Sequence, residues 1–566
     1  MASTPVPRLP GFLAMVEDAE GDANARGRAR VTTWGLSCVA SSAWVLSAVT
    51  RTADGRVSPE AIAAELEMTP AALVRLFPPF AAVRADDEGV TMVADSMGFR
   101  PLFHSHPGSD GAAVLSSSAL VAARARRAQL DQVAVGTQSL LGWQLGQRTL
   151  FQGVEKLAPG AVARLRSDGV GVRVAPARQP EGLGLDAAVT RAASLLRTSL
   201  AAVLDEHPDA VLQLTGGLDS RLLLSAIPPR RRRGLQAMTL DVPGSSDSAI
   251  ASAIAERYGI RHSVRGLADL GHLTPEAAWE ATRDAAERLD AMSDPVAFAA
   301  LAVAERSFEQ GVRISGLGGE VARGFYYVGR VRDRTYTAAD ASRLARWRMF
   351  VNEAVEPGLL ARDFAKWALE EAEQEVLRAL LDGGPEWFRA TDALYLRHRM
   401  QRWAGATDTA VGAERIVINP MLDPAFLDIA AGLTPQEKAG SRFLAALQME
   451  LDPELGRRPL DGRSAPAAYA HPAPWQPVVQ VAGTGRRLAQ KALQRVRRGN
   501  RSPAGGAVLA GKVVDHWRAR PELLDPLAAL PFLEQDWLER VLRGDHDPKP
   551  SAVGFLTALV VSAPPA

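Results

Sequence analysis

The residues best suited to chemistry form one short segment, Leu214 to Arg221, with the sequence LTGGLDSR. It follows Val211 to Leu214, a run short and apolar enough for a buried strand, and it leads into a helix-like run from Ser220 to Ala226. A strand, a glycine turn and a helix start make an anion site, because free backbone N–H groups and the helix dipole face the ligand. The spacing therefore predicts a phosphate-binding loop.

Five residues of this loop have distinct predicted roles. Gly216 and Gly217 permit close approach of the backbone to a ligand and positive φ angles. Thr215 and Ser220 add hydroxyl donors, and Asp219 supplies a carboxylate that can hold Mg²⁺ against phosphates. No lysine follows the glycines, so the loop is not the mononucleotide type that ends in Gly-Lys-Ser/Thr. The residues predict a pyrophosphate cradle for ATP; the alternative is a glycine turn before a core helix.

The loop resembles the Ser-Gly-Gly-x-Asp-Ser loop of the ATP pyrophosphatases, which cleave ATP to AMP and pyrophosphate. A second segment, Ile314 to Glu320 (ISGLGGE), resembles the Ser-Gly-Asp-Gly-Ala-Asp-Glu segment of the asparagine synthetases. This resemblance implies that Glu320 is a second metal-binding carboxylate beside Asp219. It also implies that Ser315 and Gly316 border the nucleotide.

The resemblance runs to about residue 460. The segment Gln236 to Leu240 is similar to the strand that borders adenine in the family, which implies nucleotide contacts for Met238 and Leu240. Other similar segments follow in the family's order: Ala255 to His262, Glu414 to Asp423 and Leu433 to Lys438.

The N-terminal part is similar to the family's glutaminase domain at Ala94 to Phe103 and at Phe151 to Gly160. That glutaminase works through an N-terminal cysteine, whose own α-amino group acts as base. Loss of the initiator methionine would expose Ala2, and Ser3 would need unusual processing. The only cysteine, Cys38, is internal, where we expect a small core residue. The resemblance therefore implies a glutaminase-like domain without a working glutaminase.

These segments need particular elements to position them. Residues 1–180 are rich in short strand-like runs bounded by Gly, Asp and Pro. Beyond the polar segment 178–182, a second strand at Leu235 to Leu240 and a helix at Asp247 to Tyr258 follow the phosphate loop. This order predicts a parallel sheet with crossover helices. Residues 335–450 have helical spacing and are expected to cover that sheet.

We therefore expect an α/β multi-domain protein. Residues 1–180 would form the degenerate glutaminase-like domain, which the resemblance implies is an Ntn-hydrolase-like αββα sandwich. Residues 185–470 would form an asparagine-synthetase-type ATP pyrophosphatase domain, with a parallel sheet and a helical cover. Residues 471–566 would form a helical C-terminal extension, whose basic run Arg486 to Arg498 is interpreted as a solvated helix face.

Composition limits the class of protein. A chain of 566 residues is too long for one compact core. No apolar stretch approaches the roughly 18 to 20 residues of a membrane span. The 65 Lys and Arg residues nearly balance the 64 Asp and Glu residues. The chain therefore has no large positive net charge that would attract nucleic acid. With a single cysteine and no secretory signal, we expect a cytoplasmic protein without a nucleic-acid or membrane partner.

Two residues are predicted to act in catalysis, Lys438 and Glu414. Lys438 is preferred over Arg458 and Arg463 as the cation that contacts pyrophosphate. Glu414 would deprotonate or orient the amine, with a surface salt bridge at a helix end as an equal alternative.

Departures from the family pattern narrow the substrate. Leu317 stands where asparagine synthetases have Asp and where β-lactam-forming relatives have the Tyr of a Tyr–Glu pair, so β-lactam formation is disfavoured. Arg221 and Arg323, beside the two loops, are candidates for binding an anionic substrate or phosphate. Four tryptophans are assigned to packing: Trp143, Trp367, Trp387 and Trp403.

The implied chemistry is adenylation of a substrate carboxylate by ATP with Mg²⁺, then attack of an amine and release of AMP. Relatives without a working N-terminal domain include lasso-peptide macrolactam cyclases. A peptide cyclase and a small-molecule amide synthetase are therefore ranked equally, with biosynthetic proteins as candidate partners. An asparagine synthetase that uses ammonia and a catalytically silent nucleotide-binding scaffold are the alternatives.

Overall fold

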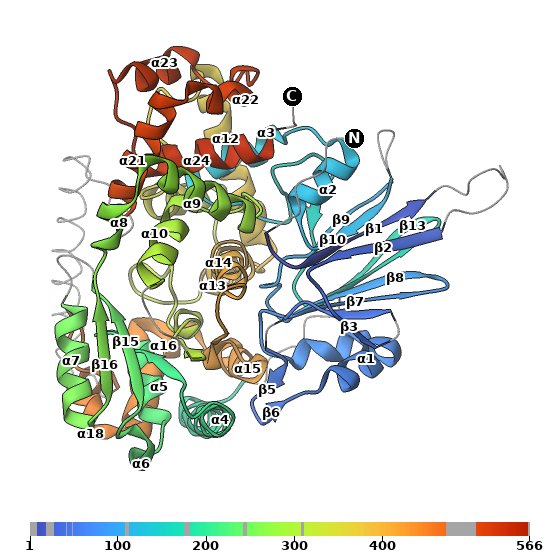
Figure 1. Cartoon of the computed structure of the whole chain (residues 1–566). Coiled ribbons are helices and arrows are strands. Elements are labelled where there is room, and N and C mark those ends of the chain that lie inside the picture. The colour runs from blue at the N-terminus through green and yellow to red at the C-terminus, as the bar shows by residue number, and fades with distance from the viewer. Residues whose placement is uncertain are drawn as a thin grey trace.

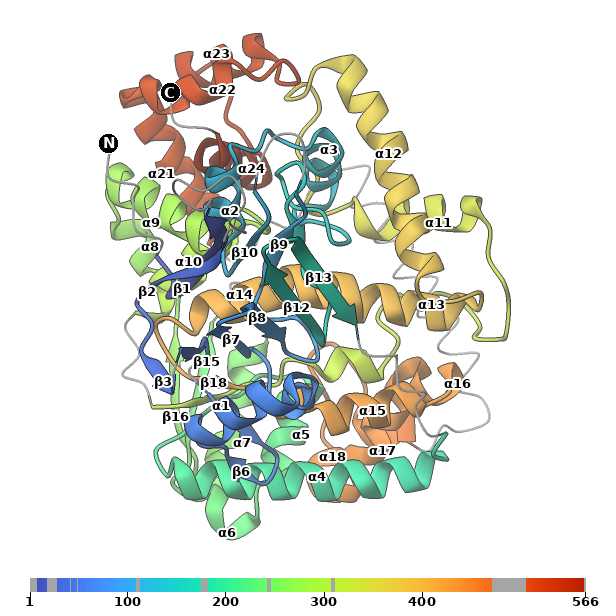
Figure 2. The same cartoon turned by 90° about the vertical axis from the view of Figure 1, so that its right-hand side faces the viewer.

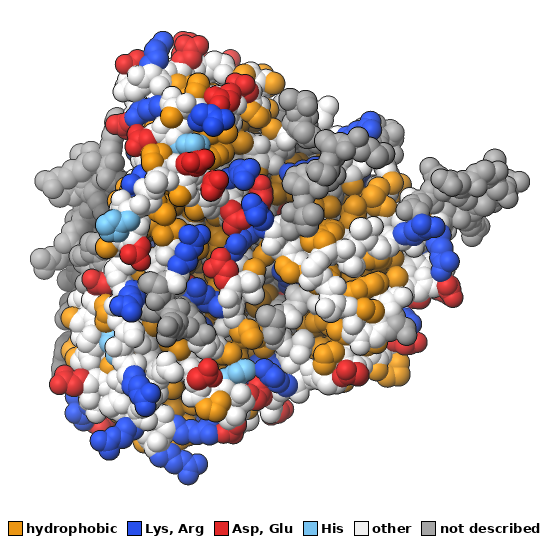
Figure 3. Space-filling model, viewed as in Figure 1, with side chains coloured by type: hydrophobic (Ala, Val, Ile, Leu, Met, Phe, Trp, Pro, Cys, Tyr) orange, Lys and Arg blue, Asp and Glu red, His pale blue; other side chains and the backbone are white. Residues whose placement is uncertain are grey.

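The computed structural model describes residues 8–17, 28–40, 42–47, 49–107, 112–174, 182–241, 246–306, 311–470 and 505–563. The basic run Arg486 to Arg498, Ser3 and most of the predicted domain boundary lie outside these residues. A sheet-rich N-terminal part lies beside a second α/β part, and the C-terminal helices lie at one end of the molecule (Figure 1). Positive and negative side chains are intermixed over the face in Figure 3.

The N-terminal part contains two antiparallel sheets. The first has the order β11 (Glu155–Lys156), β9 (Phe103–Ser105), β10 (Val114–Ser116), β1 (Gly11–Glu17), β2 (Arg28–Trp34). The second has the order β13 (Gly169–Val174), β12 (Ala161–Arg166), β8 (Gly89–Ala94), β7 (Ala81–Asp86), β4 (Ala43–Val45), β3 (Cys38–Ala40). The remaining elements are the ribbon β5 (Arg51–Thr52) and β6 (Gly55–Arg56), α1 (Pro59–Met68), the 3₁₀ turn η1 (Pro70–Arg75), α2 (Ala119–Arg126) and α3 (Gln132–Leu141).

Alternating apolar residues stack these elements in four layers, because successive side chains of a strand point to opposite faces. On β7, Val83 joins Phe12 of β1 in a core between the two sheets. Its neighbour Ala82 packs on the other side, with Ile62 of α1. On the outer face of the first sheet, Val114 shares a core with residues of α2 and α3. The result is a helix, sheet, sheet, helix arrangement.

The expectation that Cys38 is a core residue is wrong. The thiol is exposed and donates to the Ala40 carbonyl oxygen at 2.8 Å. The physical reason is its place on β3, the edge strand of the second sheet.

The second part is built on a parallel sheet of five strands. Their order is β16 (Arg261–Arg265), β15 (Gln236–Leu240), β14 (Val211–Gln213), β17 (Arg313–Ile314), β18 (Val417–Ile418). The predicted strands at β14 and β15 and the predicted helix α7 (Asp247–Tyr258) are confirmed. β17 and β18 were not predicted, because two residues are too few to show a periodic pattern. β14 is central, and crossovers leave it toward both sides, so its carboxyl end is a topological switch point, where ligands bind in open α/β sheets.

Helices account for most of the rest of the described chain. From residue 182 to 306 they are α4 (Leu185–Glu206), α5 (Leu218–Ala226), α6 (Pro229–Arg232), α8 (Asp269–His272), α9 (Pro275–Arg288) and α10 (Pro295–Glu305). From 311 to 411 they are the turn η2 (Gly319–Ala322), α11 (Ala338–Leu344), the π-helix η3 (Ala345–Met349), α12 (Arg362–Leu381), α13 (Trp387–Leu394), the π-helix η4 (Tyr395–Ala404) and α14 (Gly405–Val411). From 420 to 470 they are η5 (Pro420–Leu422), α15 (Pro424–Gly432), α16 (Pro435–Lys438), η6 (Ala439–Ser441), α17 (Arg442–Leu451), α18 (Pro453–Gly456) and α19 (Pro466–Ala470). The last are α21 (Gly506–Ala519), η7 (Pro521–Leu524), α22 (Asp525–Ala528), α23 (Gln535–Arg543) and α24 (Pro550–Ser562).

Only part of the predicted helical region covers the parallel sheet. Residues of α4, α5, α15 and α17 share the main core with β14. α12 contributes Val376 and Leu380 to the same core, but it packs mainly against α3 of the N-terminal part, so closely that a Cβ on Gly136 would lie 2.7 Å from the Ala368 Cβ (Figure 2). Within the described residues, α4 is the one helix long and apolar enough to cross a membrane. Its buried face, including Leu196 and Leu200, packs in the main core, as in an amphipathic core helix.

The C-terminal helices complete a second core. Residues of α21 and α24 pack with α9, α10, α2 and α3 in one cluster. Trp517 of α21 meets Trp279 of α9 edge to face, with ring centroids 5.9 Å apart. These helices therefore hold the N-terminal part and the second α/β part together.

The N-terminal part also docks directly on η4 and α14. Thr409 donates a hydrogen bond to the Phe99 carbonyl oxygen at 2.9 Å, and Lys156 Nζ donates to the Gln401 carbonyl oxygen at 3.1 Å. Burial holds the pKa of Lys156 well below its usual range. Gly405 lies against Phe99, where a Cβ would come within 2.8 Å of the Phe99 Cα.

Two of the predicted packing tryptophans are confirmed: Trp143 is fully buried and Trp387 is 7% exposed. Trp367 is half-buried. The prediction is wrong for Trp403, which is 37% exposed and lies against Arg399, its ring centroid 5.2 Å from the guanidinium carbon.

The close contact at Gly405 predicts a sharp sensitivity to volume. Gly405→Ala should lower the free energy of unfolding by about 1–3 kcal/mol, because the added methyl overpacks the interface with Phe99. Thermal or urea unfolding measures the change. The matched control is Gly511→Ala in α21, where a Cβ would meet nothing within 4 Å and helix propensity favours alanine. Equal stability of the two variants would contradict the docking contact.

Candidate active site

The parallel pairing of β14 with β17 brings the two predicted loops together. Leu212 pairs with Ile314, so the segments that follow both strands leave the same edge of the sheet. Glycines allow the loops to touch. A Cβ on Gly316 would lie 3.0 Å from the Ser220 N, and a Cβ on Gly319 would lie 2.3 Å from the Asp219 Oδ1. Any larger residue at 319 would displace the Asp219 carboxylate.

The first loop is held by its own side chains. Thr215 N donates to Ser220 Oγ at 3.0 Å, and Gly217 N donates to Thr215 Oγ1 at 3.1 Å. Gly216 N donates to the Asp247 carboxylate at 2.9 Å. The hydroxyls predicted to donate to phosphate thus shape the loop. Gly217 begins α5 without a side-chain cap among the described residues, which leaves a helix N-terminus suited to an anion.

Two carboxylates and one guanidinium meet between the loops. Arg323 Nη2 lies 2.8 Å from Glu320 Oε1, and Arg323 Nη1 lies 3.5 Å from Asp219 Oδ2. Burial raises the pKa of Asp219 to about 7; Glu320 adds to this, whereas Arg323 and Arg463 oppose it. The Asp219 charge is therefore costly without a cation.

The residues fit Mg²⁺ that arrives with a nucleotide. Asp219 Oδ1 is buried and has no hydrogen-bond partner among the described residues. Glu320 supplies a second oxygen donor nearby, bridged to Asp219 by Arg323. Within the described chain no group of three or more His, Cys, Asp or Glu could hold a metal. Mg²⁺ sites of this kind use one or two carboxylates and take their other ligands from phosphates and water.

The residues predicted to border the nucleotide lie around these loops. Leu214 N donates to the Met238 carbonyl oxygen at 2.9 Å; Met238 is buried and Leu240 is half-buried at the end of β15. In the second loop, Ser315 Oγ accepts a hydrogen bond from Leu317 N at 3.2 Å. Both strand ends therefore flank the phosphate loop.

Lys438 meets the second loop through an aspartate. Its Nζ lies 2.8 Å from Asp392 Oδ2, and the Tyr327 hydroxyl donates to the same oxygen at 2.9 Å. Tyr327 belongs to the segment that carries Glu320. Lys438 is thus a buried, partnered cation linked to the loop.

Glu414 is not brought to the site. It is exposed and forms an ion pair with Arg288 at 2.5 Å. It precedes β18, and in a parallel sheet the amino end of one strand lies opposite the carboxyl edge that carries the phosphate loop. The surface salt bridge, one of the two readings of this residue, is what the structure contains.

Arg221 is wrongly predicted as an anion ligand. It is fully buried and donates to the carbonyl oxygens of Arg458 at 2.9 Å and Gly216 at 3.3 Å. It ties the segment around Arg458 to the phosphate loop, as does the bond from Asp461 N to the Gly216 carbonyl oxygen at 3.1 Å. This places the exposed Arg463 over the loop, where it lowers the pKa of Asp219. Arg463 ranked below Lys438 in the sequence, because spacing alone did not show this turn.

An aromatic wall behind the second loop was also missed. Phe325 stacks on Tyr395 of the π-helix η4 with centroids 4.4 Å apart, and Arg399 lies over Phe325 at 5.5 Å. π-Helical turns often occur at functional sites, but their sequences carry no distinct period. The Phe-Tyr-Tyr run after Gly324 was the available signal.

Family comparison agrees with this geometry. The sequence matches the asparagine synthase family over residues 191–447 and a glutamine amidotransferase domain over residues 62–174. The chain belongs to the asparagine synthetase-like family. In general terms, members of the asparagine synthase family are ATP-dependent carbon–nitrogen ligases. No curated protein matches the sequence.

Among solved structures, the allosteric regulatory enzyme of purine biosynthesis is similar at 12% identity and a TM-score of 0.15. The alignment covers 36% of this asparagine synthetase-like chain and 53% of that chain, so it spans about half of that enzyme. At this TM-score, the likeness says nothing about the fold.

The raised pKa of Asp219 predicts that this ionised carboxylate lowers the stability of the protein at neutral pH. The pKa of Asp219 is about 7 in the folded protein and 3.8 ordinarily, so protonation of this carboxyl favours the folded state. This contribution to the free energy of unfolding is fully present below pH 3.8 and is lost as the pH rises through 7. Asp219→Asn should therefore stabilise the metal-free, nucleotide-free protein at pH 8 by up to about 4 kcal/mol, and the gain should shrink toward pH 4. Thermal unfolding in EDTA measures it, with the exposed Asp515→Asn as control. A variant less stable than the native protein at pH 8 would contradict the burial cost.

Proposed function

We propose that this protein is an AMP-forming amide ligase that activates a substrate carboxylate as an acyl-adenylate and joins it to an amine. The observation that carries the proposal is the meeting of Asp219 and Glu320 between two touching loops, beside the open N-terminus of α5. This combination offers backbone N–H groups to phosphate and carboxylates to Mg²⁺.

The residues divide the work by charge. A substrate carboxylate oxygen attacks the α-phosphorus, the bond to the β-phosphate breaks, and pyrophosphate leaves. The α5 N-terminus, Arg463 and Arg323 face the charge that develops on the phosphates, which is where electrostatic preorganisation lowers a barrier. Lys438 supports them through Asp392. The amine then attacks the acyl carbonyl, loses a proton, and AMP leaves.

Mg²⁺ bound by Asp219 and Glu320 would neutralise phosphate charge and orient the nucleotide. Arg323 now bridges these carboxylates, so nucleotide binding requires its guanidinium to move toward phosphate. This bridge also favours the second candidate, a silent nucleotide-binding scaffold, because the pair is already neutralised without ATP.

The proposed ligase has no glutaminase of its own. Its single cysteine, Cys38, lies on the exposed edge strand β3. In this view residues 1–180 are an Ntn-hydrolase-like domain retained for docking, residues 185–470 form the synthetase, and 471–566 are an extension. The buried contacts of Phe99 with Gly405 and Thr409 support a structural role for the first part.

For the substrate, a peptide macrolactam cyclase and a small-molecule amide synthetase remain equal candidates, in a cytoplasmic protein. Ammonia-dependent asparagine synthesis is the further alternative. These candidates differ in the acid and the amine but share the adenylation step, so adenylation is tested first.

The test is formation of AMP and pyrophosphate by purified protein with ATP and Mg²⁺, across amino acids, acidic metabolites and Asp- or Glu-containing peptides. Hydroxylamine in a parallel set would trap an acyl-adenylate as a hydroxamate. We expect substrate-dependent AMP that falls at least about 100-fold in Asp219→Ala, since one transition-state contact is worth this much. Asp515→Asn should match the native protein. ATP binding without AMP from any substrate would favour the silent scaffold.

A further inference from the structure

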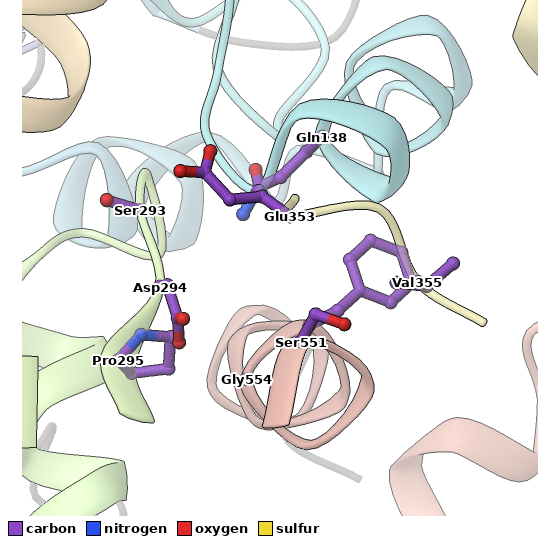
Figure 4. A pocket seen from close by; sticks show the side chains of 10 residues that line it. Gln138, Ser293, Asp294, Pro295, Glu353, Val355, Ser551 and Gly554 are labelled. Atoms are coloured by element: carbon purple, nitrogen blue, oxygen red, sulfur yellow. The ribbon is translucent and has the colours of Figure 1, made fainter. Parts of the chain in front are cut away.

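A small cavity of about 20 Å³ lies where three parts of the chain meet. Its wall is formed by Gln138 of α3, by Asp294 at the start of α10, by Glu353 and by Ser551 of α24 (Figure 4). A polar cavity of this volume accommodates one or two water-sized particles. It lies outside the two nucleotide loops.

The wall presents oxygen acceptors. Gln138 is 3% exposed; its Nε2 donates to the Ala291 carbonyl oxygen at 2.8 Å, while its Oε1 is buried without a partner among the described residues. Glu353 Oε2 is likewise buried and unpartnered within the described chain. Asp294 caps α10 by accepting from Val296 N at 2.9 Å, and the Ser551 hydroxyl donates elsewhere. Among the described residues Gln138 Oε1 therefore has no hydrogen-bond donor, whereas Asp294 keeps its backbone donors.

The charge of the wall selects the kind of ligand. Asp294 and Glu353 carry two negative charges when ionised, and Arg399 offsets one of them at 3.6 Å from Glu353. Burial raises the pKa of Asp294 to about 6, so it is ionised at neutral pH at a cost that a cation would relieve. A net charge of −1 with amide and carboxylate oxygens matches a monovalent cation. Mg²⁺ demands near-ideal octahedral geometry and keeps several waters, and Ca²⁺ takes about six to eight oxygen ligands, so a cavity of this volume suits neither ion.

We propose that this junction binds a monovalent cation such as K⁺, held by Asp294, Glu353 and the Gln138 Oε1 between α3, α10 and α24. Gly554 permits it, because a Cβ there would lie 2.5 Å from Asp294 Oδ1 and push the carboxylate away. The cation ties the N-terminal part to the C-terminal helices.

The site also reaches the catalytic loop. Glu353 holds Arg399, and Arg399 lies over Phe325, in the same segment as Glu320. A cation that draws Glu353 toward the cavity alters the position of Arg399 and, through it, the wall behind the second loop. The cation therefore acts as a positioning element for the ligase site, independently of which acid is activated.

The test is thermal unfolding of the full chain in KCl against choline chloride at equal ionic strength, without nucleotide. A ligand bound only by the folded state raises the melting temperature. We expect K⁺ to raise it by about 1–3 °C in the native protein and in the control Asp515→Asn. Asp294→Asn should lose the rise, because asparagine caps the helix as well as aspartate but carries no charge.

Equal melting temperatures in KCl and choline chloride would overturn the proposal and leave the cavity to water. So would a full K⁺ response in Asp294→Asn, or a response to MgCl₂ alone. If Asp294→Asn does not fold, Gln138→Met provides the second variant, since it removes Oε1 without changing charge. It should reduce the K⁺ response by at least half, and an unchanged response would count against the site.

Discussion

The ionisation of Asp219 is the constraint on which the rest of the site depends. Its carboxylate is buried where two loops touch, and burial raises its pKa to about 7. Gly319 leaves it the room, and Arg323 compensates its charge. A protein that only needed to be stable would not keep this carboxylate, because it lowers stability at neutral pH. We infer that the carboxylate is kept because it binds a cation that arrives with a nucleotide.

That constraint explains the sheet beneath it. Parallel strands carry the loops that follow them to one edge of a sheet, and adjacent strands bring two loops into contact. β14 and β17 do so although β17 has two residues. On its other side β17 is held by β18, where Ser315 N extends the pairing by donating to the Ile418 carbonyl oxygen at 2.9 Å. The N-terminal part docks on η4, and the stacked rings of Phe325 and Tyr395 lie between η4 and the second loop. Without glutaminase chemistry, the N-terminal part would still stabilise the protein through these contacts.

Much of this arrangement could be predicted from the sequence. Strand, loop and helix around Gly216 follow from local pattern, and the segments with Glu320 and Met238 follow from resemblance. What failed depends on contacts distant in sequence. The place of Arg221 required the carbonyl of Arg458, more than 230 residues away. Glu414 required knowing at which end of the sheet β18 begins. The π-helix η4 and the shared core of α9 with α21 have no sequence period that reveals them.

The most direct measurement is calorimetric binding of a non-hydrolysable α,β-methylene analogue of ATP, with and without Mg²⁺, to the native protein and to Asp219→Asn. It needs no knowledge of the acid or the amine. If the phosphates and Mg²⁺ lie between the two loops, Mg²⁺ will strengthen binding at least about tenfold in the native protein and little in the variant, a difference of about 1.4 kcal/mol. Equal Mg²⁺ dependence in both proteins, or no nucleotide binding at all, would contradict this account of the site.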